Sequence, residues 1–585
     1  MSESIVAVTT SQFTENPASC NCPSPVPVGK TVYYTLVFGG IFSIPLCFNY
    51  AFAWTMYHWQ HLRVHERQIP PVYPSFLPYL GSVIELAING QTYLKRATSY
   101  AGEMAAARMT ILGKEIYFFQ DRESVAAMWK QQLLSSPVEA YIYSLSYIFG
   151  MKETALATYR ADDSGPFRKP YPGSNVRSQD RVDHITHSGL LKALTGSGLA
   201  PTAQQFMESF LERLDNLPAD ENWTDMPDLL KFFQDVVGTA SMQAVAGPTL
   251  LKLNPTFVDD FWSYDKYVPW FARGVPSFIM LGAVKNRGNL INQIKSWYAY
   301  ARQHFDESSI SKDGDGDPFW GSELMRGRQK TLLLARNQDD DSLASADLGL
   351  IWASVSNSTP TAMFATMHMF KEPGLVARVR KSVDSQRDSN NPSALDVERL
   401  LQNPLLSSIY AETLRMYVKS YFVASSPHAD VALGRGWLPK GEIALVNSGI
   451  AHMDARVWNT KSGVYPVDSF WADRFITDPR DPSSGPVKPG VERQARGEPT
   501  AEKTEPYFSL DGLEGSWIPY GGGHAICPGR FLTKNLILLS SAVIADRFDI
   551  QILGGHLKLS SAKFGLGSLR PKEAIPFRIK RRVTD

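Results

Sequence analysis

Near the C-terminus the chain reads Tyr520-Gly521-Gly522-Gly523-His524-Ala525-Ile526-Cys527-Pro528-Gly529-Arg530. An apolar segment from about Phe531 to Phe548 follows, and its pattern predicts a helix. Because glycine has no Cβ, the backbone of this loop can approach a neighbour closely. At the start of a helix, the dipole and the free N–H groups favour a sulfur anion. The loop is therefore expected to present one thiolate, at Cys527, to something large and flat.

A lone thiolate is one of the few ligands with which proteins hold haem iron. The stretch resembles the haem-binding loop of the cytochrome P450 family, F-x-x-G-x-R-x-C-x-G. Tyr520 takes the Phe place, and Gly523 and Gly529 take the two glycine places. Cys527 takes the place of the axial iron ligand, so the resemblance implies haem as the cofactor. The alternative for the loop by itself is a glycine-rich turn before a core helix, with a buried and inert cysteine.

The haem-propionate contacts of the family are only partly matched. Ala525 stands where the family usually has Arg, and His524 beside it is a candidate replacement. His184 and His187 lie where the family places a basic helix over the propionates, although the typical Trp-x-x-x-Arg is absent. We expect His184, His187 and His524 to contact the cofactor, and surface positions are the alternative for the first two.

Composition narrows the possible classes of protein. The chain has 585 residues, 44% of them hydrophobic, which is enough for a large core. Its formal net charge of +1 offers no electrostatic case for binding nucleic acid. Three of the four cysteines lie within the first 47 residues, so the main body contains only Cys527 and no disulfide framework. This pattern is typical of a reducing compartment.

The N-terminal region divides into three predicted segments. Residues 1–29 are polar and predicted to be disordered. Residues 30–58 include an uncharged, aromatic-rich stretch, predicted to be a transmembrane anchor, with a buried core helix as the alternative. Residues 59–80 are predicted to be a stiff proline-rich linker, because four prolines fall within nine residues. The excess of Arg after the anchor places the body, residues 81–585, in the cytosol.

The body is predicted to be mainly α with smaller β-sheets. Apolar periodicity predicts helices over residues 229–246 and 347–371, and shorter runs predict strands over residues 443–451 and 557–559. Three polar stretches rich in Gly, Pro and charged residues are predicted to be surface loops: residues 161–181, 311–346 and 478–516. Together with the resemblance, this indicates the cytochrome P450 fold, an α+β architecture with an N-terminal transmembrane helix.

A charged motif lies roughly a hundred residues before the cysteine. Glu412 and Arg415 are three apart in a predicted helix, residues 405–417, so their side chains share a face. An exposed ion pair is the ordinary interpretation of such a spacing. The order of motifs resembles the E-x-x-R of the family, followed by Ala472-Asp473-Arg474-Phe475 in place of P-E-R-F. The resemblance implies that Glu412, Arg415 and Arg474 form a buried ionic network behind the haem.

The segment Ala353–Pro360 departs from the family pattern. It resembles the helix that crosses the distal face of the haem, where an acid and a threonine usually manage protons. Here Ser356 takes the acid place, Asn357 the threonine place, and Ser358 follows. An amide donates and accepts hydrogen bonds but does not titrate. Asn357 and Ser358 are therefore the candidate distal residues, and a polar kink in a core helix is the alternative.

The version of this segment resembles the branch that contains cholesterol 7α-hydroxylase, sterol 12α-hydroxylase and prostacyclin synthase. The resemblance implies a monooxygenase that inserts one atom of O₂ into an apolar, lipid-like substrate, with electrons from an NADPH-dependent reductase. It also implies a single-pass protein of the endoplasmic reticulum membrane, in contact with membrane lipid. The alternatives are a haem-thiolate isomerase or dehydratase that acts on a peroxide without reductase, and a haem-binding sensor.

Overall fold

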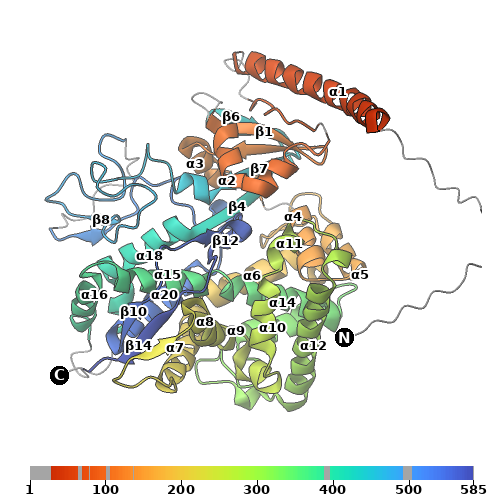
Figure 1. The fold of residues 1–585 in the computed structure, drawn as a ribbon. Helices are drawn as coiled ribbons and strands as arrows, with labels where there is room; N and C mark the ends of the chain where they lie inside the picture. Colours follow the sequence, from red (N-terminus) through yellow and green to blue (C-terminus); the bar gives the residue numbers. More distant parts are fainter. Residues whose placement is uncertain are drawn as a thin grey trace, which may run out of the picture.

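The computed structural model describes residues 28–62, 69–77, 79–99, 106–135, 138–387, 395–491 and 504–583 (Figure 1). The helices outside the central layer are α2 Val83–Ser99, α3 Arg122–Lys130, α4 Val138–Tyr143, α5 Glu153–Ala161, α6 Val182–Thr195, α8 Leu229–Phe233, α10 Phe257–Asp265, α11 Val268–Ala272, α12 Leu281–His304, α13 Glu323–Thr331, α16 Leu375–Asp384, α17 Val397–Gln402 and α19 Ser448–Ala451. Small sheets accompany these helices, so the predicted mainly α architecture with smaller sheets is confirmed.

A central layer of helices carries the largest hydrophobic cluster of the molecule. Helix α15 (Ser358–Lys371) packs against α18 (Pro404–Tyr417) and α20 (Arg530–Arg547), and α20 also contacts α7 (Leu199–Asp215). Almost every residue of α15 is buried, which explains why its sequence lacks a polar face. The largest hydrophobic cluster joins apolar side chains from these helices. Helix α14 (Asp340–Val355) precedes α15 and packs on α12 and on α9, Thr239–Leu253.

The largest sheet has five strands in the order β1-β2-β7-β4-β12. The bounds of these strands are β1 Ala106–Ile111, β2 Lys114–Phe119, β4 Val418–Ser425, β7 Ile443–Asn447 and β12 Leu566–Ser568. Strand β2 runs parallel to β7, and the other pairs are antiparallel. Because β4 begins directly after α18 and pairs with β12, the sheet carries the C-terminal segment back to the centre of the molecule.

The remaining strands form smaller sheets at the edges of the helical region. A three-stranded sheet has the order β10-β14-β3, and three two-stranded sheets pair β5 with β6, β8 with β9, and β11 with β13. The bounds are β3 Thr224–Met226, β5 Val431–Leu433, β6 Gly436–Leu438, β8 Ile476–Thr477, β9 Tyr507–Phe508, β10 Phe548–Ile552, β11 Leu559–Ser560, β13 Arg570–Pro571 and β14 Phe577–Arg581.

The helices predicted from apolar periodicity are present, with one informative interruption. The range 229–246 is α8 and the first part of α9, joined by a π-helical turn at Gln234–Gly238. The range 347–371 is divided into α14 and α15 at Ser356 and Asn357. Pro360 lies in the first turn of α15 and has no N–H to donate to the carbonyl of Ser356. The helix therefore opens at the residues that were singled out in the sequence.

Three predictions of loops or strands need correction. The range 311–346 contains α13 and the start of α14, because Ser322 and Asp339 cap these two helices with their side chains. The prediction of a loop was therefore wrong at the polar residues that cap these two helices. In the range 443–451, the strand β7 ends at Asn447 and α19 follows. In the range 557–559, only Leu559 belongs to a strand.

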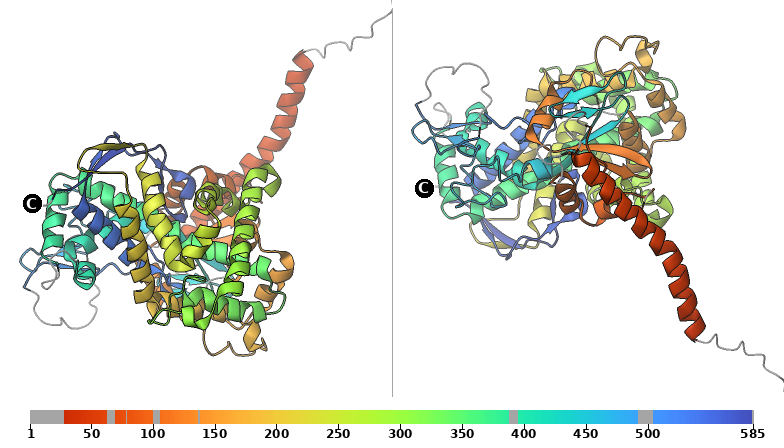
Figure 2. Two further views of the ribbon diagram at one scale, coloured as in Figure 1. Left: turned by 90° about the horizontal axis from the view of Figure 1, so that it is seen from below. Right: turned by 90° about the horizontal axis from the view of Figure 1, so that it is seen from above.

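Helix α1 (Val28–Leu62) covers the predicted membrane anchor and projects away from the body (Figures 1 and 2). Its exposed side chains include Ile41, Phe42, Ile44, Phe48 and Phe52. Within the described ranges, however, the structure has no helix that is both long and apolar enough to span a bilayer. The prediction of a helix is confirmed, and the prediction that it crosses the membrane is not supported. The predicted disordered tail, residues 1–29, lies outside the described residues except at its last two positions.

The proline-rich stretch is attached to the edge of the large sheet. The N–H of Tyr73 donates to the carbonyl of Arg108 at 2.7 Å, and the N–H of Arg108 donates to the carbonyl of Pro71 at 2.9 Å. The ring of Tyr73 is buried and packs on Tyr57 of α1. Residues 71–73 therefore pack along the edge of the body, and a turn that Gly81 closes on the carbonyl of Leu77 leads into α2.

Candidate functional site

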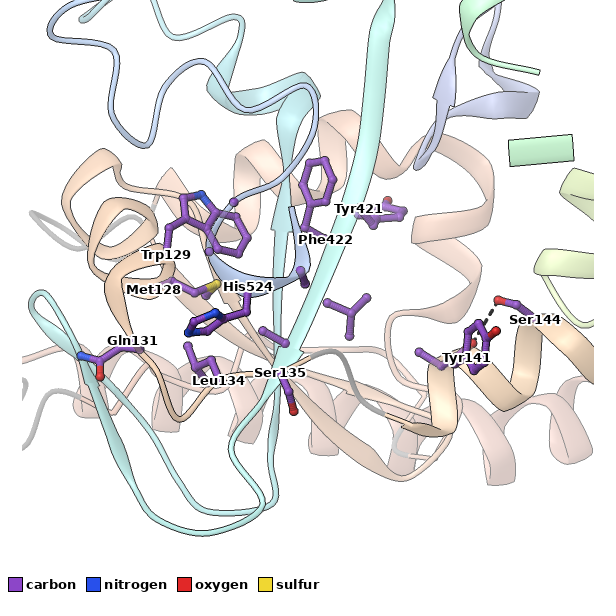
Figure 3. Close-up of a pocket in the computed structure, with 16 residues that line it drawn as sticks. Met128, Trp129, Gln131, Leu134, Ser135, Tyr141, Ser144, Tyr421, Phe422 and His524 are labelled. Carbon is purple, nitrogen blue, oxygen red and sulfur yellow. Dashed lines mark hydrogen bonds between the residues drawn. The ribbon is translucent and has the colours of Figure 1, made fainter. Parts of the chain in front are cut away.

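The glycine run before Cys527 allows the loop to pack against two aromatic side chains. A Cβ on Gly521 would lie 2.8 Å from the ring of Phe422, and one on Gly522 would lie 2.4 Å from the ring of Trp129. Gly521 and Gly523 have φ of +71° and +62°, in the left-handed region that favours glycine. Figure 3 shows Trp129 and Phe422 next to this turn. The glycines are needed both for conformation and for close approach.

The thiol of Cys527 lies at the end of this turn, directly before α20. The N–H of Cys527 donates to the carbonyl of Tyr520 at 3.0 Å, which fixes the backbone of the loop. Burial raises the pKa of the Cys527 thiol, and the N–H of Gly529 and the charge of Arg530 oppose this increase. The cysteine is free and partly exposed. The raised pKa does not prevent the thiol from acting as a metal ligand, because a bound cation deprotonates a thiol that coordinates it.

The side chain of Tyr520 packs against α18, where it is partly buried. Its hydroxyl lies 2.8 Å from the hydroxyl of Tyr410 on α18, and burial raises its pKa well above the usual range. This pair ties the cysteine loop to the helix that carries Glu412. The role of Tyr520 that follows from its contacts is to position the loop.

Two adjoining cavities flank the cysteine loop. One, of about 300 Å³, is lined by Trp129 and Phe422 together with Gly522, Gly523 and His524 (Figure 3). The other, of about 320 Å³, lies between the loop and α6. The two cavities share four lining residues: Ser135, Tyr141, His524 and Ala525. They therefore form neighbouring lobes of one space beside the loop, and Ile526 and Pro528, the two residues that flank Cys527, line the second lobe.

The candidate propionate residues separate into two groups. His187 and His524 both line the second cavity, and burial lowers the pKa of His187. His184 instead places its Nδ1 2.9 Å from the carbonyl of Pro166, so it holds the neighbouring loop. Asp183 lies four residues before His187 and lines the same cavity. Burial, with a contribution from the charge of Asp162, raises the pKa of Asp183 to about 6.

Glu412, Arg415 and Arg474 form one ionic network, and all three side chains are fully buried. Nε of Arg415 lies 2.7 Å from Glu412 Oε2, and Nη2 lies 2.8 Å from Oε1. Nε of Arg474 lies 3.0 Å from Oε1, and the N–H of Trp471 adds a donor at 3.1 Å. Burial by itself would raise the pKa of Glu412, but the two guanidinium groups outweigh it and hold this pKa below its usual value.

One face of α14 is open although the helix crosses the interior. Ala353 is exposed and Asn357 is partly exposed, whereas Ile351 and Val355 are buried. Oδ1 of Asn357 accepts a hydrogen bond of 3.0 Å from the N–H of Ser568 in β12. The hydroxyl of Ser358 is buried and donates to the carbonyl of Ser354 at 2.9 Å. Asn357 is thus oriented by a neighbouring strand, while the hydroxyl of Ser358 at the start of α15 bonds back to the last turn of α14.

Comparison with known proteins supplies the family. The sequence model of the family described as Cytochrome P450 matches residues 184–482. The chain is 30% identical to the cytochrome P450 monooxygenase efuG of Hormonema carpetanum, over 93% of this chain and 96% of that protein. It is 31% identical to the cytochrome P450 monooxygenase fsoE of Humicola fuscoatra, over 88% of each chain. This chain belongs to the cytochrome P450 family.

The predicted branch is confirmed as well. The cholesterol 7-alpha-monooxygenase of Cricetulus griseus is 21% identical over 87% of the present P450 and 93% of its own length. Membership of the family makes the protein a haem enzyme and an oxidoreductase of the monooxygenase type. The family match ends before Cys527, so the roles of individual residues in the cysteine loop depend on the geometry described above.

The residues of this P450 fit a haem. A single free thiol lies at the end of a glycine turn, the largely buried helix α20 follows it, and two adjoining cavities lie beside the loop. The site also has a departure from the family, because the side chain of Ala525 offers no donor for a propionate. His187 and His524 line the space beside Ala525 and carry ring N–H donors.

Sequence reasoning missed several residues of this site. Asp183 could have been found from the sequence, because it lies four residues before His187 and therefore on the same face of the predicted helix. Trp129 and Phe422 carry no local signal, since they approach the loop from α3 and β4. The same is true of Ser568, whose backbone orients Asn357 from a distance of 211 positions in the sequence. Such contacts follow only from the packing of distant segments.

Proposed function

We propose that this P450 hydroxylates or otherwise oxygenates an apolar, lipid-like secondary metabolite such as a sterol or terpenoid, using an NADPH-dependent reductase. The observation that carries the proposal is the free thiol of Cys527 at the end of a glycine turn whose residues line two adjoining cavities. Bound haem would supply reductive activation of O₂, so that one oxygen atom enters the substrate and the other leaves as water. The sterol 7α-hydroxylases among its relatives support the substrate class.

In this proposal each part of the site has a distinct task. Cys527 would hold the haem iron as its axial ligand, with Gly523 and Gly529 shaping the loop around it. His187 and His524 would bind the propionates. Asn357 would hold a water molecule or a substrate oxygen on the distal face, because the bond from Ser568 to Oδ1 leaves the amide Nδ2 free to donate. Ser358, bonded to Ser354, would support the bend of the helix.

The test is turnover of a panel of sterols and terpenoids by the purified holoenzyme with NADPH, reductase and ¹⁸O₂. We expect one ¹⁸O atom in the product and no product when the reductase is omitted. Product that forms without reductase, or that lacks ¹⁸O, would support the isomerase or dehydratase instead. NADPH consumption that does not depend on any substrate, with no product, would support the sensor.

The same assay tests the distal residue. With Asn357→Ala, we expect NADPH consumption to continue while the yield of product per NADPH falls about tenfold or more, because the reacting oxygen is no longer oriented. Ser345→Ala is a matched control, since this buried hydroxyl lies in α14 and bonds only to a carbonyl one turn earlier. An unchanged product yield in Asn357→Ala would remove Asn357 from the mechanism.

We further propose that α1 attaches the protein to the endoplasmic reticulum membrane, with the catalytic body in the cytosol. The support is a helix that projects from the body with large apolar side chains in solvent, Phe42 and Phe48 being 69% and 77% exposed. We expect the full chain to sediment with microsomes and a chain lacking residues 1–62 to shift largely to the supernatant. Equal sedimentation of both chains would place the contact elsewhere.

A further inference from the structure

A buried charged cluster lies beside the open face of α14, formed by Asp265, Lys563 and Arg570. Asp265 is the last residue of α10, and the two cations flank β12. Lys563 Nζ lies 2.6 Å from Asp265 Oδ1, and Arg570 Nη2 lies 3.4 Å from Oδ2. The side chains of Asp265 and Lys563 are each 5% exposed and that of Arg570 is 11% exposed. The cluster thus buries two positive charges with one negative charge.

The cluster is bonded to α14 at the point where the helix opens. The indole N–H of Trp352 donates to Asp265 Oδ1 at 2.7 Å, and Lys563 Nζ lies 5.2 Å from the centre of the indole ring. Because Pro360 lacks an N–H, the carbonyl of Ser356 has no helical donor, and Nη2 of Arg570 donates to it. Helix, strand and charge cluster are therefore one hydrogen-bonded unit.

This unit lies next to Asn357, the candidate distal residue. Trp352 and the C-cap residue Ser356 are four apart and share one stripe at the end of α14, and the exposed Ala353 and the partly exposed Asn357 follow them in the sequence. The N–H of Ser568 bonds to Asn357, while the carbonyl of the same residue accepts from Nη1 of Arg570 at 2.7 Å. A group bound at the cluster would consequently be separated from the amide of Asn357 by one residue, Ser568, which is bonded to both Arg570 and Asn357.

The cluster has unused capacity for an anion. Among the described residues, Asp265 is the one acidic side chain recorded in contact with Lys563 or Arg570. The ammonium group of Lys563 has three N–H donors and one recorded hydrogen bond, to Asp265. Burial lowers the pKa of Lys563 to about 8, so the group is still mainly cationic at neutral pH. The cluster has two cations and one anion in a buried place, and a second anion would balance the remaining positive charge.

We propose that Lys563 and Arg570 form a subsite for a carboxylate carried by an otherwise apolar substrate, with Asp265 holding the two cations in place. This inference rests on the proposed function, since it names a chemical feature of the same substrate. The carboxylate would accept hydrogen bonds from Lys563 and lie against the indole of Trp352. The apolar skeleton would extend along the open face of α14 towards Asn357.

The test uses the holoenzyme and two probes, 3β-hydroxy-5-cholenoic acid and its methyl ester. Binding is measured by the change of haem spin state in the absorption spectrum. We expect the acid to bind about tenfold more tightly than the ester, or better, because hydrogen bonds to a charged acceptor are stronger than those to a neutral one. Lys563→Met should remove most of this preference. Lys558→Met, which removes a Lys that is 66% exposed in the same segment, should leave it unchanged.

Two further results decide the matter even if Lys563→Met does not fold. Asp265→Asn removes the internal anion and should strengthen the preference for the acid. Equal affinities of the unmodified enzyme for acid and ester, or no spectral response to the acid, would overturn the subsite. The reduced, CO-bound spectrum of the same sample separates this outcome from the proposed function. If that spectrum shows thiolate-ligated haem, only the subsite has failed, and if it does not, the haem-thiolate proposal has failed.

Discussion

Replacing Cys527 with alanine is expected to abolish the absorption band of thiolate-ligated haem in the reduced, CO-bound protein, together with all turnover. The reason is that the described part of the chain has only one other free cysteine, Cys47, which lies on α1. Among the residues that the structure describes, no second thiol is therefore available to the iron at this loop. The measurement is the difference spectrum of the purified variant, with haem content determined on the same sample.

Cys47→Ala is the matched control for this variant. It removes an exposed thiol from the helix that projects from the body, so the spectrum should be unchanged. A normal thiolate band in Cys527→Ala would refute the assignment of the axial ligand. Loss of the band in both variants would indicate that the substitutions damage folding, and that the loss does not identify the ligand.

Glu412→Gln is expected to destabilise the protein by about 3–5 kcal/mol, because it leaves two buried guanidinium groups without their carboxylate. A loss of this size is a large fraction of the total stability of an ordinary protein, about 5–15 kcal/mol. We therefore expect little folded holoprotein at 37 °C. The measurements are haem retention and the midpoint of thermal unfolding.

Glu153→Gln provides the comparison for an exposed pair. Glu153 pairs with Arg160 on the surface, and its side chain is 72% exposed, so no change in unfolding is expected. An equal and small effect of the two variants would show that the buried network is dispensable. The network also predicts a dependence on pH. Because the pKa of Glu412 is lowered, its contribution is complete above the ordinary value of about 4.3 and is lost as the pH falls through the folded-state pKa.

The fold was largely predictable where the sequence carries a local period. The apolar periodicity of residues 405–417 and 531–548 corresponds to α18 and α20, because the pattern of burial and the helical repeat coincide there. The prediction of a loop was wrong for two parts of the range 311–346, namely α13 and the start of α14, which Ser322 and Asp339 cap. A polar residue at a helix cap and one in a loop have the same composition, and only the helix that follows distinguishes them.

The site was predictable to the extent that its residues lie in ordered motifs. The position of Cys527 after a glycine turn and the grouping of Glu412 with Arg415 both depend on short spacings. The contact of His187 with the cavity, and that of His184 with Pro166 instead, could not be separated by sequence, because both residues lie on α6 and differ only in what packs against them.

What the sequence by itself determined is the family, the position of Cys527 after the glycine turn, and the break between α14 and α15 just before Pro360. Each of these follows from residue type and local spacing, which act over one or two turns of chain. Only the tertiary structure decided that Ser568 orients Asn357 and that Arg570 takes the carbonyl released at Ser356. The same holds for the pairing of Asp265 with Lys563, which are 298 positions apart. Contacts of this kind arise from the pairing of β4 with β12 and from the ion pairs that Asp265 of α10 makes with Lys563 and Arg570, which no local pattern encodes.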